Sequence, residues 1–206
     1  MDDVRRVLNA FRDANLTARP SKCHMGCSTL EFLGHIVGNG ELKPTPEGVS
    51  KVLAASRPTT KKEVRAFMGM VGYYRKFIPN MAVIATPLTD LTKKDAPSKV
   101  RWEDAQENAF QTLKERVSRF PILRLPDGEK EFVLRTDASD VGIGAVLLQC
   151  HEGELFPVQY ASRKLHIRER AYPIIERECL AIVWAVKKLP TSCMGDSLGF
   201  RLITFH

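Results

Sequence analysis

The sequence predicts an α+β protein in which a helical region is followed by an antiparallel sheet with one buried helix. Three observations support this prediction: apolar residues repeat with helical spacing in the first half of the chain, they form strand-like runs from residue 131 onwards, and a long apolar helix comes last. The chain has 206 residues, of which 44% are hydrophobic and 27% charged. This is enough for one large or two small hydrophobic cores and argues against a largely disordered chain.

The composition also argues against membrane and secreted classes. No apolar run approaches the roughly 20 residues that a membrane-spanning helix requires, so we expect no membrane partner. The acidic start, Met1-Asp2-Asp3, is not followed by the apolar stretch of a secretory signal. The five cysteines are an odd number without the spacing of a disulfide framework, which is typical of a reducing environment. We therefore expect an intracellular protein, cytoplasmic or nuclear.

The positive charge is concentrated in the first half of the chain. Residues 1–94 contain 15 Lys and Arg against 8 Asp and Glu, whereas the remaining residues contain 16 of each kind. A basic region joined to a neutral one indicates a polyanionic partner, of which nucleic acid is the commonest. The alternative is a solvated helical surface that happens to be rich in Lys.

The first predicted elements are a helix and a hairpin. Apolar residues at helical spacing predict an amphipathic helix that ends near Asn15. Its apolar positions are Val4, Val7, Leu8 and Phe11. The runs 30–33 and 35–37, separated by Gly34 and followed by an Asn-Gly turn signal, predict a β-hairpin.

Two helices in series are predicted next. Thr45 and Pro46 mark a helix start, because Thr can cap the first turn and Pro fits the first helical position. Thr60 and Glu63 form a capping box ahead of a stronger helix that ends near Ile78. The apolar stripe of this helix consists of Val64, Phe67, Met68, Val71 and Tyr74. The polar residues 92–101 are the best candidate for a linker.

The second half of the chain predicts a helix, three strands and a final helix. The helix carries Ala109, Phe110, Leu113 and Val117 on one face. The strand-like runs are 132–137, 145–149 and 156–161, and they are expected to form an antiparallel sheet. Residues 172–189 predict a long helix that is apolar on most sides and therefore largely buried.

Asp137 is the strongest candidate for chemistry. It ends an apolar strand, where a carboxylate is unfavourable unless it is paired or binds a metal, and the nearby Gly142 and Gly144 permit a tight return of the chain and close backbone approach. Glu178 lies between apolar positions of the last helix and is expected to point near the core. Two such carboxylates can together hold Mg²⁺ or Mn²⁺, which prefer oxygen ligands. The alternative is that Asp137 is an ordinary capping or turn residue.

Several segments resemble the Pol polyprotein of gypsy-type LTR retrotransposons. Residues 131–149, with Thr-Asp-Ala-Ser and Gly-Ile-Gly-Ala-Val-Leu, are similar to the opening strands of its ribonuclease H domain. Residues 160–165 and 176–183 resemble the third strand and first helix of that domain. Upstream, Phe32-Leu33-Gly34-His35 resembles the primer-grip hairpin of the reverse transcriptase, and residues 67–78 resemble its thumb. The resemblance covers about residues 1–189 in the family's order.

The resemblance implies four parts. Residues 1–43 are the end of the reverse transcriptase palm with its primer-grip-like hairpin, and residues 44–94 are a thumb-like helical domain. Residues 95–130 are a connection, and residues 131–206 are a truncated ribonuclease H-like domain. The polymerase aspartates of the family would lie upstream of residue 1, and the Asp2-Asp3 pair is interpreted as a helix N-cap.

The resemblance also implies roles for the two carboxylates. Asp137 and Glu178 correspond to the first two metal-binding, catalytic acids of the nuclease, with Mg²⁺ or Mn²⁺ as the cofactor. The family has two further acids in this site. Phe205 stands where one of them is expected, and the other would lie beyond His206. We therefore expect a weakly held metal and impaired catalysis.

The basic helical region is expected to bind a primer–template or an RNA–DNA hybrid. The candidates for phosphate contacts are Lys61, Lys62, Arg65, Arg75 and Lys76. Tyr73 or Tyr74 is expected to lie against sugars or bases, although helical phase favours Tyr74 as a buried residue. His35 is expected to be a structural residue of the hairpin rather than a catalyst.

The resemblance implies RNA-templated DNA synthesis and Mg²⁺-dependent hydrolysis of RNA in RNA–DNA hybrids. The alternative is a non-catalytic relic that grips nucleic acid through its basic thumb. A third reading is a relic without any selected activity.

Overall fold

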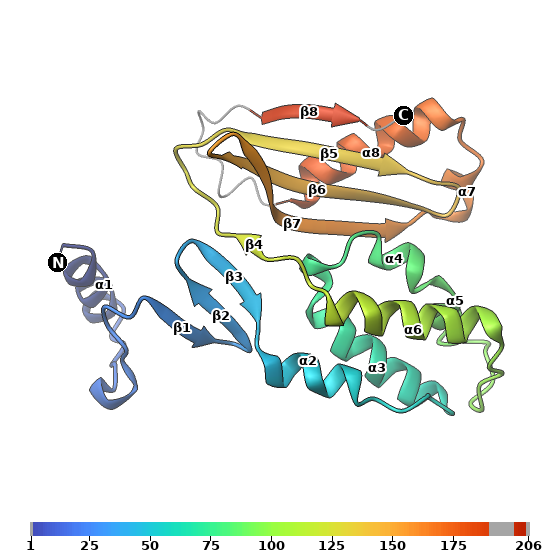
Figure 1. Ribbon diagram of the computed structural model, residues 1–206, viewed down its shortest axis with the longest axis horizontal. Coiled ribbons are helices and arrows are strands. Elements are labelled where there is room, and N and C mark those ends of the chain that lie inside the picture. Colours follow the sequence, from blue (N-terminus) through green and yellow to red (C-terminus); the bar gives the residue numbers. More distant parts are fainter. Residues whose placement is uncertain (1, 190–199, 205–206) are drawn as a thin grey trace.

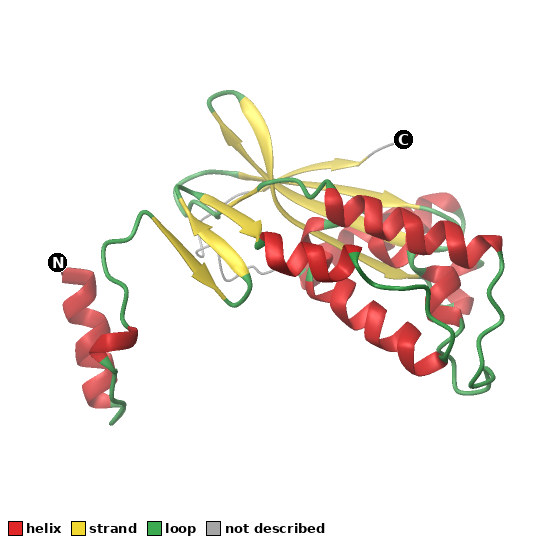
Figure 2. Ribbon diagram, turned by 60° about the horizontal axis from the view of Figure 1, so that its bottom comes forward, coloured by secondary structure: helices red, strands yellow, loops and turns green. Residues whose placement is uncertain are grey.

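The computed structural model describes residues 2–189 and 200–204, which form a helical unit below a larger sheet (Figure 1). We call residues 46–118 the helical unit, and residues 132–188 with 200–204 the sheet unit. A second, smaller sheet and the N-terminal helix extend to one side (Figures 1 and 2). None of the described helices is long and apolar enough to cross a membrane.

The N-terminal helix is α1 (Asp2–Asp13), followed by a 3₁₀ turn (Pro20–Lys22). The predicted amphipathic helix is therefore confirmed, and the Asp2-Asp3 pair lies in its first turn rather than on a strand. No residue of α1 is buried, and the helix lies apart from the rest of the chain in both views. Its apolar stripe is consequently exposed.

The small sheet has the order β1-β2-β3-β4. β1 (Thr29–Phe32) and β2 (His35–Gly38) form the predicted hairpin, and β3 (Glu41–Pro44) extends it through a second tight turn. Leu33 and Gly34 have φ values of 47° and 65°, which are typical of a two-residue type I′ turn. β4 (Leu123–Arg124) joins β3 from a distant part of the chain.

The helical unit consists of α2 (Pro46–Leu53), α3 (Lys61–Tyr73), α4 (Met81–Ile84), α5 (Thr86–Asp90) and α6 (Asp104–Ser118), with a 3₁₀ turn (Arg75–Phe77) after α3. Both predicted helix starts are confirmed. The Thr45 side chain accepts a hydrogen bond from the Gly48 amide at 3.2 Å. Thr60 and Glu63 cap each other's backbone amides in a capping box.

One hydrophobic core joins the helices of this unit. The predicted stripe residues Val64, Phe67, Val71 and Tyr74 are buried in it. α6 belongs to the same core, since the Phe110 ring lies 4.6 Å from that of Phe67. The expected division at residue 94/95 therefore does not coincide with a break in packing. As a division between functional units it stays a prediction.

The sheet unit contains β5 (Phe132–Ala138), β6 (Gly142–His151), β7 (Glu154–Lys164) and β8 (Phe200–Thr204) in the order β7-β6-β5-β8. The three predicted strands are confirmed and pair antiparallel. β8 adds a strand that runs parallel to β5. Phe205 and His206 lie outside the described residues.

The final helices are α7 (Ile167–Arg170) and α8 (Ile174–Lys188), and α8 covers one face of the sheet. Ala181 and Ala185 are buried against the strands. However, Ile175 and Val183 are 74% and 52% exposed, so the prediction that this helix is largely buried is wrong. The described chain covers only the side of α8 that faces the sheet, and the apolar residues on its other side remain in contact with solvent.

Gly142 and Gly144 also differ from expectation. Neither glycine has a positive φ, because both lie within β6 rather than in a tight return. The turn before β6 is instead held by Ser139, whose amide donates to the Gly142 carbonyl at 2.9 Å. The expected close approach is present: α4 lies against β6 and β7 at this end of the sheet (Figure 1).

Candidate active site and nucleic-acid interface

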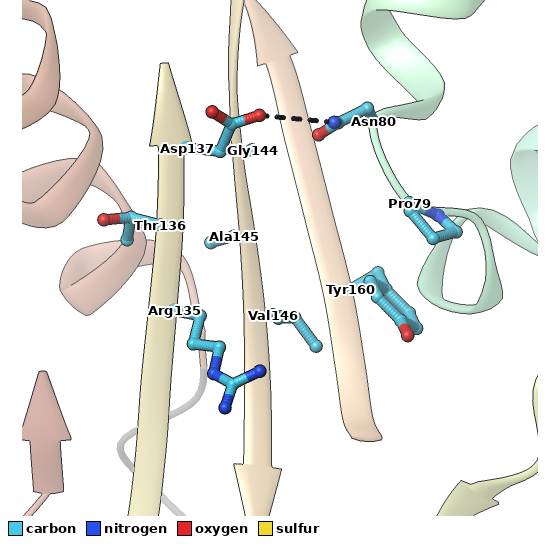
Figure 3. A pocket seen from close by; sticks show the side chains of 9 residues that line it. All are labelled: Pro79, Asn80, Arg135, Thr136, Asp137, Gly144, Ala145, Val146 and Tyr160. Atoms are coloured by element: carbon cyan, nitrogen blue, oxygen red, sulfur yellow. Dashed lines mark hydrogen bonds between the residues drawn. The ribbon is translucent and has the colours of Figure 1, made fainter. Parts of the chain in front are cut away.

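Asp137 lies near the end of β5, on the face of the sheet opposite α8. Side chains alternate along a strand, and Phe132 and Leu134 pack against α8. Asp137 therefore points to the other face, where Figure 3 shows its carboxylate directed toward Asn80. The Asn80 Nδ2 atom donates to Asp137 Oδ2 at 3.5 Å. Asp137 is exposed, so its charge remains accessible to solvent or a ligand.

The Asp137 side chain lines a pocket of about 330 Å³ between α4 and the sheet. Its lining residues are Pro79, Asn80, Arg135, Thr136, Asp137, Gly144, Ala145, Val146 and Tyr160 (Figure 3). Arg135 and Asp137 are two residues apart on β5, so both reach the same face. The pocket thus combines a carboxylate, a guanidinium and an amide.

Glu178 lies on α8, one turn before Ala181, and is partly buried. Its Oε2 atom is buried and has no hydrogen-bond partner in the described chain. The preceding residue, Arg177, forms an ion pair with Asp140 in the turn between β5 and β6. A buried carboxylate oxygen without a partner is costly, and a bound cation or water is an ordinary way to satisfy it.

The structure does not bring the two predicted ligands into one pocket. Glu178 is absent from the lining of the Asp137 pocket, and α8 covers the opposite face of β5. Within residues 2–189 and 200–204, no group of three or more His, Cys, Asp or Glu is arranged to hold a metal. The oxygen donors and the unpartnered Oε2 atom fit a hard divalent cation in chemical type. The assignment of Asp137 and Glu178 as metal ligands therefore stays a prediction.

The primer-grip-like hairpin, Phe32 to His35, is fastened to the end of α3. His35 is 7% exposed, its Nδ1 atom lies 2.8 Å from the Leu33 carbonyl oxygen, and its ring stacks on Phe77. Burial lowers the pKa of His35, against the hydrogen bond to Leu33, which raises it. In contrast, Phe32 and Leu33 are 59% and 71% exposed. His35 is thus packed inside the protein, whereas the tip of the hairpin is exposed to solvent.

Tyr73 and Tyr74 have different surroundings. Tyr74 is 5% exposed and lies in the helical core, as helical phase predicts. Tyr73 is 49% exposed, and its hydroxyl donates to the Leu33 carbonyl. The hydroxyl of Tyr73 therefore holds the hairpin tip, while the exposed part of its ring is still available for a sugar or base.

Two of the predicted phosphate-binding residues bind the chain itself. The Lys61 ammonium donates to the carbonyls of Lys94 and Ala96, each at 3.2 Å, and also to that of Lys93. Arg65 donates to the Thr92 carbonyl at 3.1 Å. Both side chains thus hold the segment that sequence patterns indicate as a linker.

The other three predicted phosphate-binding residues are differently placed. Lys62 is exposed and makes no ion pair or hydrogen bond within the described residues. Arg75 and Lys76 line a second pocket, of about 340 Å³, between the helical unit and the sheet unit, together with Lys188. Burial lowers the pKa of Lys76, and its ammonium lies 5.4 Å from the centre of the Phe77 ring.

Sequence reasoning did not single out Asn80, Arg135 or Tyr160. Arg135 had a usable signal, since it precedes Asp137 by two residues on a predicted strand and must share its face. Asn80 had none, because only the docking of α4 on the sheet brings it to Asp137.

Comparisons with known proteins agree with this fold. The RNase H-like domain found in reverse transcriptase matches residues 102–198. The chain is 45% identical over 195 residues to the retrovirus-related Pol polyprotein from transposon 297 of Drosophila melanogaster, an alignment that covers 95% of this chain and 18% of the relative. It is 35% identical over 204 residues to the transposon Tf2-3 polyprotein of Schizosaccharomyces pombe, covering 98% and 15%. The chain therefore spans less than a fifth of the length of these relatives.

Two solved structures have a similar fold. The foamy viral protease-reverse transcriptase in complex with an RNA/DNA hybrid has a TM-score of 0.74 and 20% identity, covering 89% of this chain and 25% of that chain. The foamy viral protease-reverse transcriptase in complex with dsDNA has a TM-score of 0.75 and 20% identity, covering 86% and 37%. Together with the sequence matches, they place the fold among reverse transcriptases with ribonuclease H-like domains. The chain therefore belongs to the retrotransposon Pol polyproteins, consistent with the gypsy type, and corresponds to part of their reverse transcriptase and ribonuclease H-like region.

Proposed function

We propose that this region of the polyprotein binds an RNA–DNA hybrid and contributes Asp137 and Glu178 to hydrolysis of the RNA strand. The observation that carries the proposal is the exposed Asp137 carboxylate at the end of a ribonuclease H-like strand, where it lines a pocket with room for a ligand. Glu178 supports it, because its buried Oε2 atom lacks a partner in the described chain.

The proposed ligands of Mg²⁺ or Mn²⁺ are Asp137 and Glu178, and the bound ion would supply activation of water and stabilisation of the leaving oxygen in phosphodiester cleavage. For both carboxylates to bind one ion, α8 would have to bring Glu178 from the face it covers to the Asp137 side of β5. The chain's own groups have separate tasks. Arg135 reaches the same pocket and places positive charge where a phosphate would approach. Tyr160 adds an apolar, half-buried wall. Two carboxylates alone hold an ion weakly, so we expect slow cleavage by this region.

The test is cleavage of an RNA–DNA hybrid by the purified chain with Mg²⁺, comparing the wild type with Asp137→Asn. We expect the variant to lose at least about 100-fold in rate, since loss of even an outer-shell partner of a metal site costs about 10–100-fold. The matched control is Asp95→Asn, which changes an exposed loop carboxylate outside the pocket. Equal rates for Asp137→Asn and the wild type would contradict the proposal.

A second candidate function is binding of primer–template without turnover. Lys62 favours it, because its ammonium is exposed and unengaged within the described residues and lies on α3 with Lys61 and Arg65. The exposed hairpin tip, Phe32 and Leu33, adds an apolar contact surface. Such a module would bind hybrid or duplex with a strong dependence on salt and would not cleave it.

A further inference from the structure

We propose that Asn80, which belongs to the helical unit, is a positioning residue for Asp137 in the sheet unit. Its side-chain amide orients the carboxylate, so the geometry of the nuclease pocket depends on the docking of α4. This inference rests on the proposed function, because it assigns a role in the same pocket. Four observations carry it.

The first observation is that the Asn80 side chain does not cap the helix that follows it. Asn80 precedes α4, a position where Asn commonly caps the helix by accepting from a backbone amide. Here it makes no capping hydrogen bond. The Ser162 hydroxyl of β7 accepts from the Ala82 amide instead, at 2.9 Å. Because Ser162 supplies the cap, the Asn80 side chain does not have to turn its oxygen toward the helix and can direct its amide group toward Asp137.

The second observation is that β6 leaves room for α4. A Cβ atom at Gly144 would overlap the Asn80 Oδ1 atom. A Cβ atom at Gly142 would lie 2.7 Å from Val83 Cγ2, which is closer than real contacts of this kind. Gly144 pairs with Asp137 across the two strands, so its missing side chain opens the space that Asn80 enters. Gly144 is thus explained by the approach of Asn80, and Gly142 by the approach of both α4 and the Arg163 carbonyl of β7.

The third observation is that the segment after Asn80 is anchored to the sheet a second time. The Lys164 ammonium donates to the Thr86 carbonyl at 3.3 Å and pairs with Asp90 at 3.2 Å. The Ser162 and Lys164 contacts together fix α4 and α5 on β7. These attachments hold the backbone next to Asn80 close to the sheet, so only the side-chain rotamer of Asn80 has to be ordered when it bonds to Asp137.

The fourth observation is the geometry of the contact itself. Nδ2 of Asn80 donates to one carboxylate oxygen of Asp137, and Figure 3 shows the other oxygen directed away from Asn80. A neutral amide orients a carboxylate without neutralising it. Asn80 therefore favours the orientation of Asp137 seen in Figure 3 and leaves its charge for the ligand.

The experiment uses the full 206-residue chain with Asn80→Gly and Gly144→Ala. Gly tolerates the positive φ of Asn80, 50°, so the first variant removes the amide with little backbone strain. The second variant keeps both polar side chains and displaces Asn80. The matched control is Asn39→Gly, at a turn residue with a φ of 51°. The measurements are kcat and KM for hybrid cleavage, Mn²⁺ affinity by titration, and the unfolding temperature.

We expect both variants to lower kcat and Mn²⁺ affinity by about 10-fold, which is typical for an outer-shell partner, with KM and the unfolding temperature close to the control. A purely structural role would lower the unfolding temperature and leave the folded protein's Mn²⁺ affinity unchanged, which would overturn the inference. Wild-type kcat and affinity in Asn80→Gly, while Asp137→Asn loses cleavage, would also overturn it and leave the proposed function intact. If Asp137→Asn itself retains full cleavage, the proposed function fails and the inference fails with it.

Discussion

Polar side chains that look equivalent in the sequence have different partners in the structure. Lys61 and Lys62 are neighbours at the start of α3, but Lys61 binds backbone carbonyls while Lys62 remains exposed. Gln149 is fully buried, and it bonds to the backbone amide and carbonyl of Asp127 at 2.9 and 2.7 Å. Such contacts satisfy buried polar groups and hold loops in place. The side chains that make them are then not free to bind a ligand from solvent.

His35 provides a prediction about pH at the scale of one residue. Burial lowers its pKa below the ordinary value of 6.5, and the charge of Lys76 acts in the same direction. Between the folded and unfolded pKa values the unfolded chain binds more protons, so stability is fully present above about pH 6.5 and decreases as the pH falls. The decrease levels off below the folded-state pKa.

The measurement is the free energy of unfolding by urea between about pH 8 and pH 5, comparing the wild type with His35→Gln. We expect the stability of His35→Gln to fall less at acidic pH than that of the wild type. A control variant, His24→Gln at an exposed position, is expected to show the same fall as the wild type. The same pH dependence in His35→Gln and the wild type would contradict the prediction.

At the scale of single elements, the helices form where capping and periodicity agree. α3 begins at a complete capping box, in which Thr60 accepts from the Glu63 amide at 3.2 Å and Glu63 accepts from the Thr60 amide at 3.4 Å. Hydrogen bonds from the amide and hydroxyl of Thr59 also lower the pKa of Glu63. α8 is present where periodicity predicts it, but its outer face is exposed. Periodicity predicts that a helix forms and does not show which other segments cover it.

The capping box of α3 gives the prediction at this scale. Thr60→Ala removes the side-chain acceptor of the Glu63 amide and is expected to lower the free energy of unfolding by about 1 kcal/mol. Urea denaturation of the full chain measures this change. Thr17→Ala, in an exposed loop after α1, is the control and is expected to have little effect. A loss in Thr60→Ala no larger than that in the control would argue against the box as a stabilising feature.

At the scale of the whole molecule, the two units are joined where α4 and the 3₁₀ turn Arg75–Phe77 lie against β7, beside the face of the sheet that carries Asp137. Basic residues lie on both sides of this junction, with Arg75 and Lys76 from the helical unit and Lys188 from α8 around one pocket. Among the residues that the structure describes, no carboxylate lines that pocket. Lys188 of the sheet unit therefore adds to the positive charge of Arg75 and Lys76 at this junction, an arrangement that suits a polyanion.

Salt dependence tests this arrangement and the second candidate function together. We expect the affinity for an RNA–DNA hybrid to fall linearly with salt on logarithmic axes, and Lys62→Ala to reduce the slope by about 0.7–0.9, the value for one lost phosphate contact. Lys51→Ala is the matched control, because its ammonium is already paired with Glu47 at 2.7 Å. Affinity that is independent of salt would contradict a phosphate-binding role for this half.

Much of the fold could be predicted from the sequence, but less of the site. The hairpin at Gly34, the helix starts at Thr45 and Thr60, and the strand that ends near Asp137 all depend on residues close together in the chain. The engagement of Lys61 and Arg65 could not be predicted, because their partners lie about 30 residues away on a loop without periodicity. The burial of α8 was also predicted wrongly, because the periodicity of a helix does not show whether another segment covers its outer face.

The sequence by itself determined the order and type of the elements, the basic first half, and the identity of Asp137 and Glu178 as the acids to consider. Only the tertiary structure decided which face of the sheet Asp137 occupies and what it meets there. Its contact with Asn80 joins residues 57 positions apart and depends on a glycine that permits the approach of α4. Local patterns follow from propensity and hydrogen bonding along the chain, whereas contacts between distant segments follow from shape and packing, which no local pattern contains.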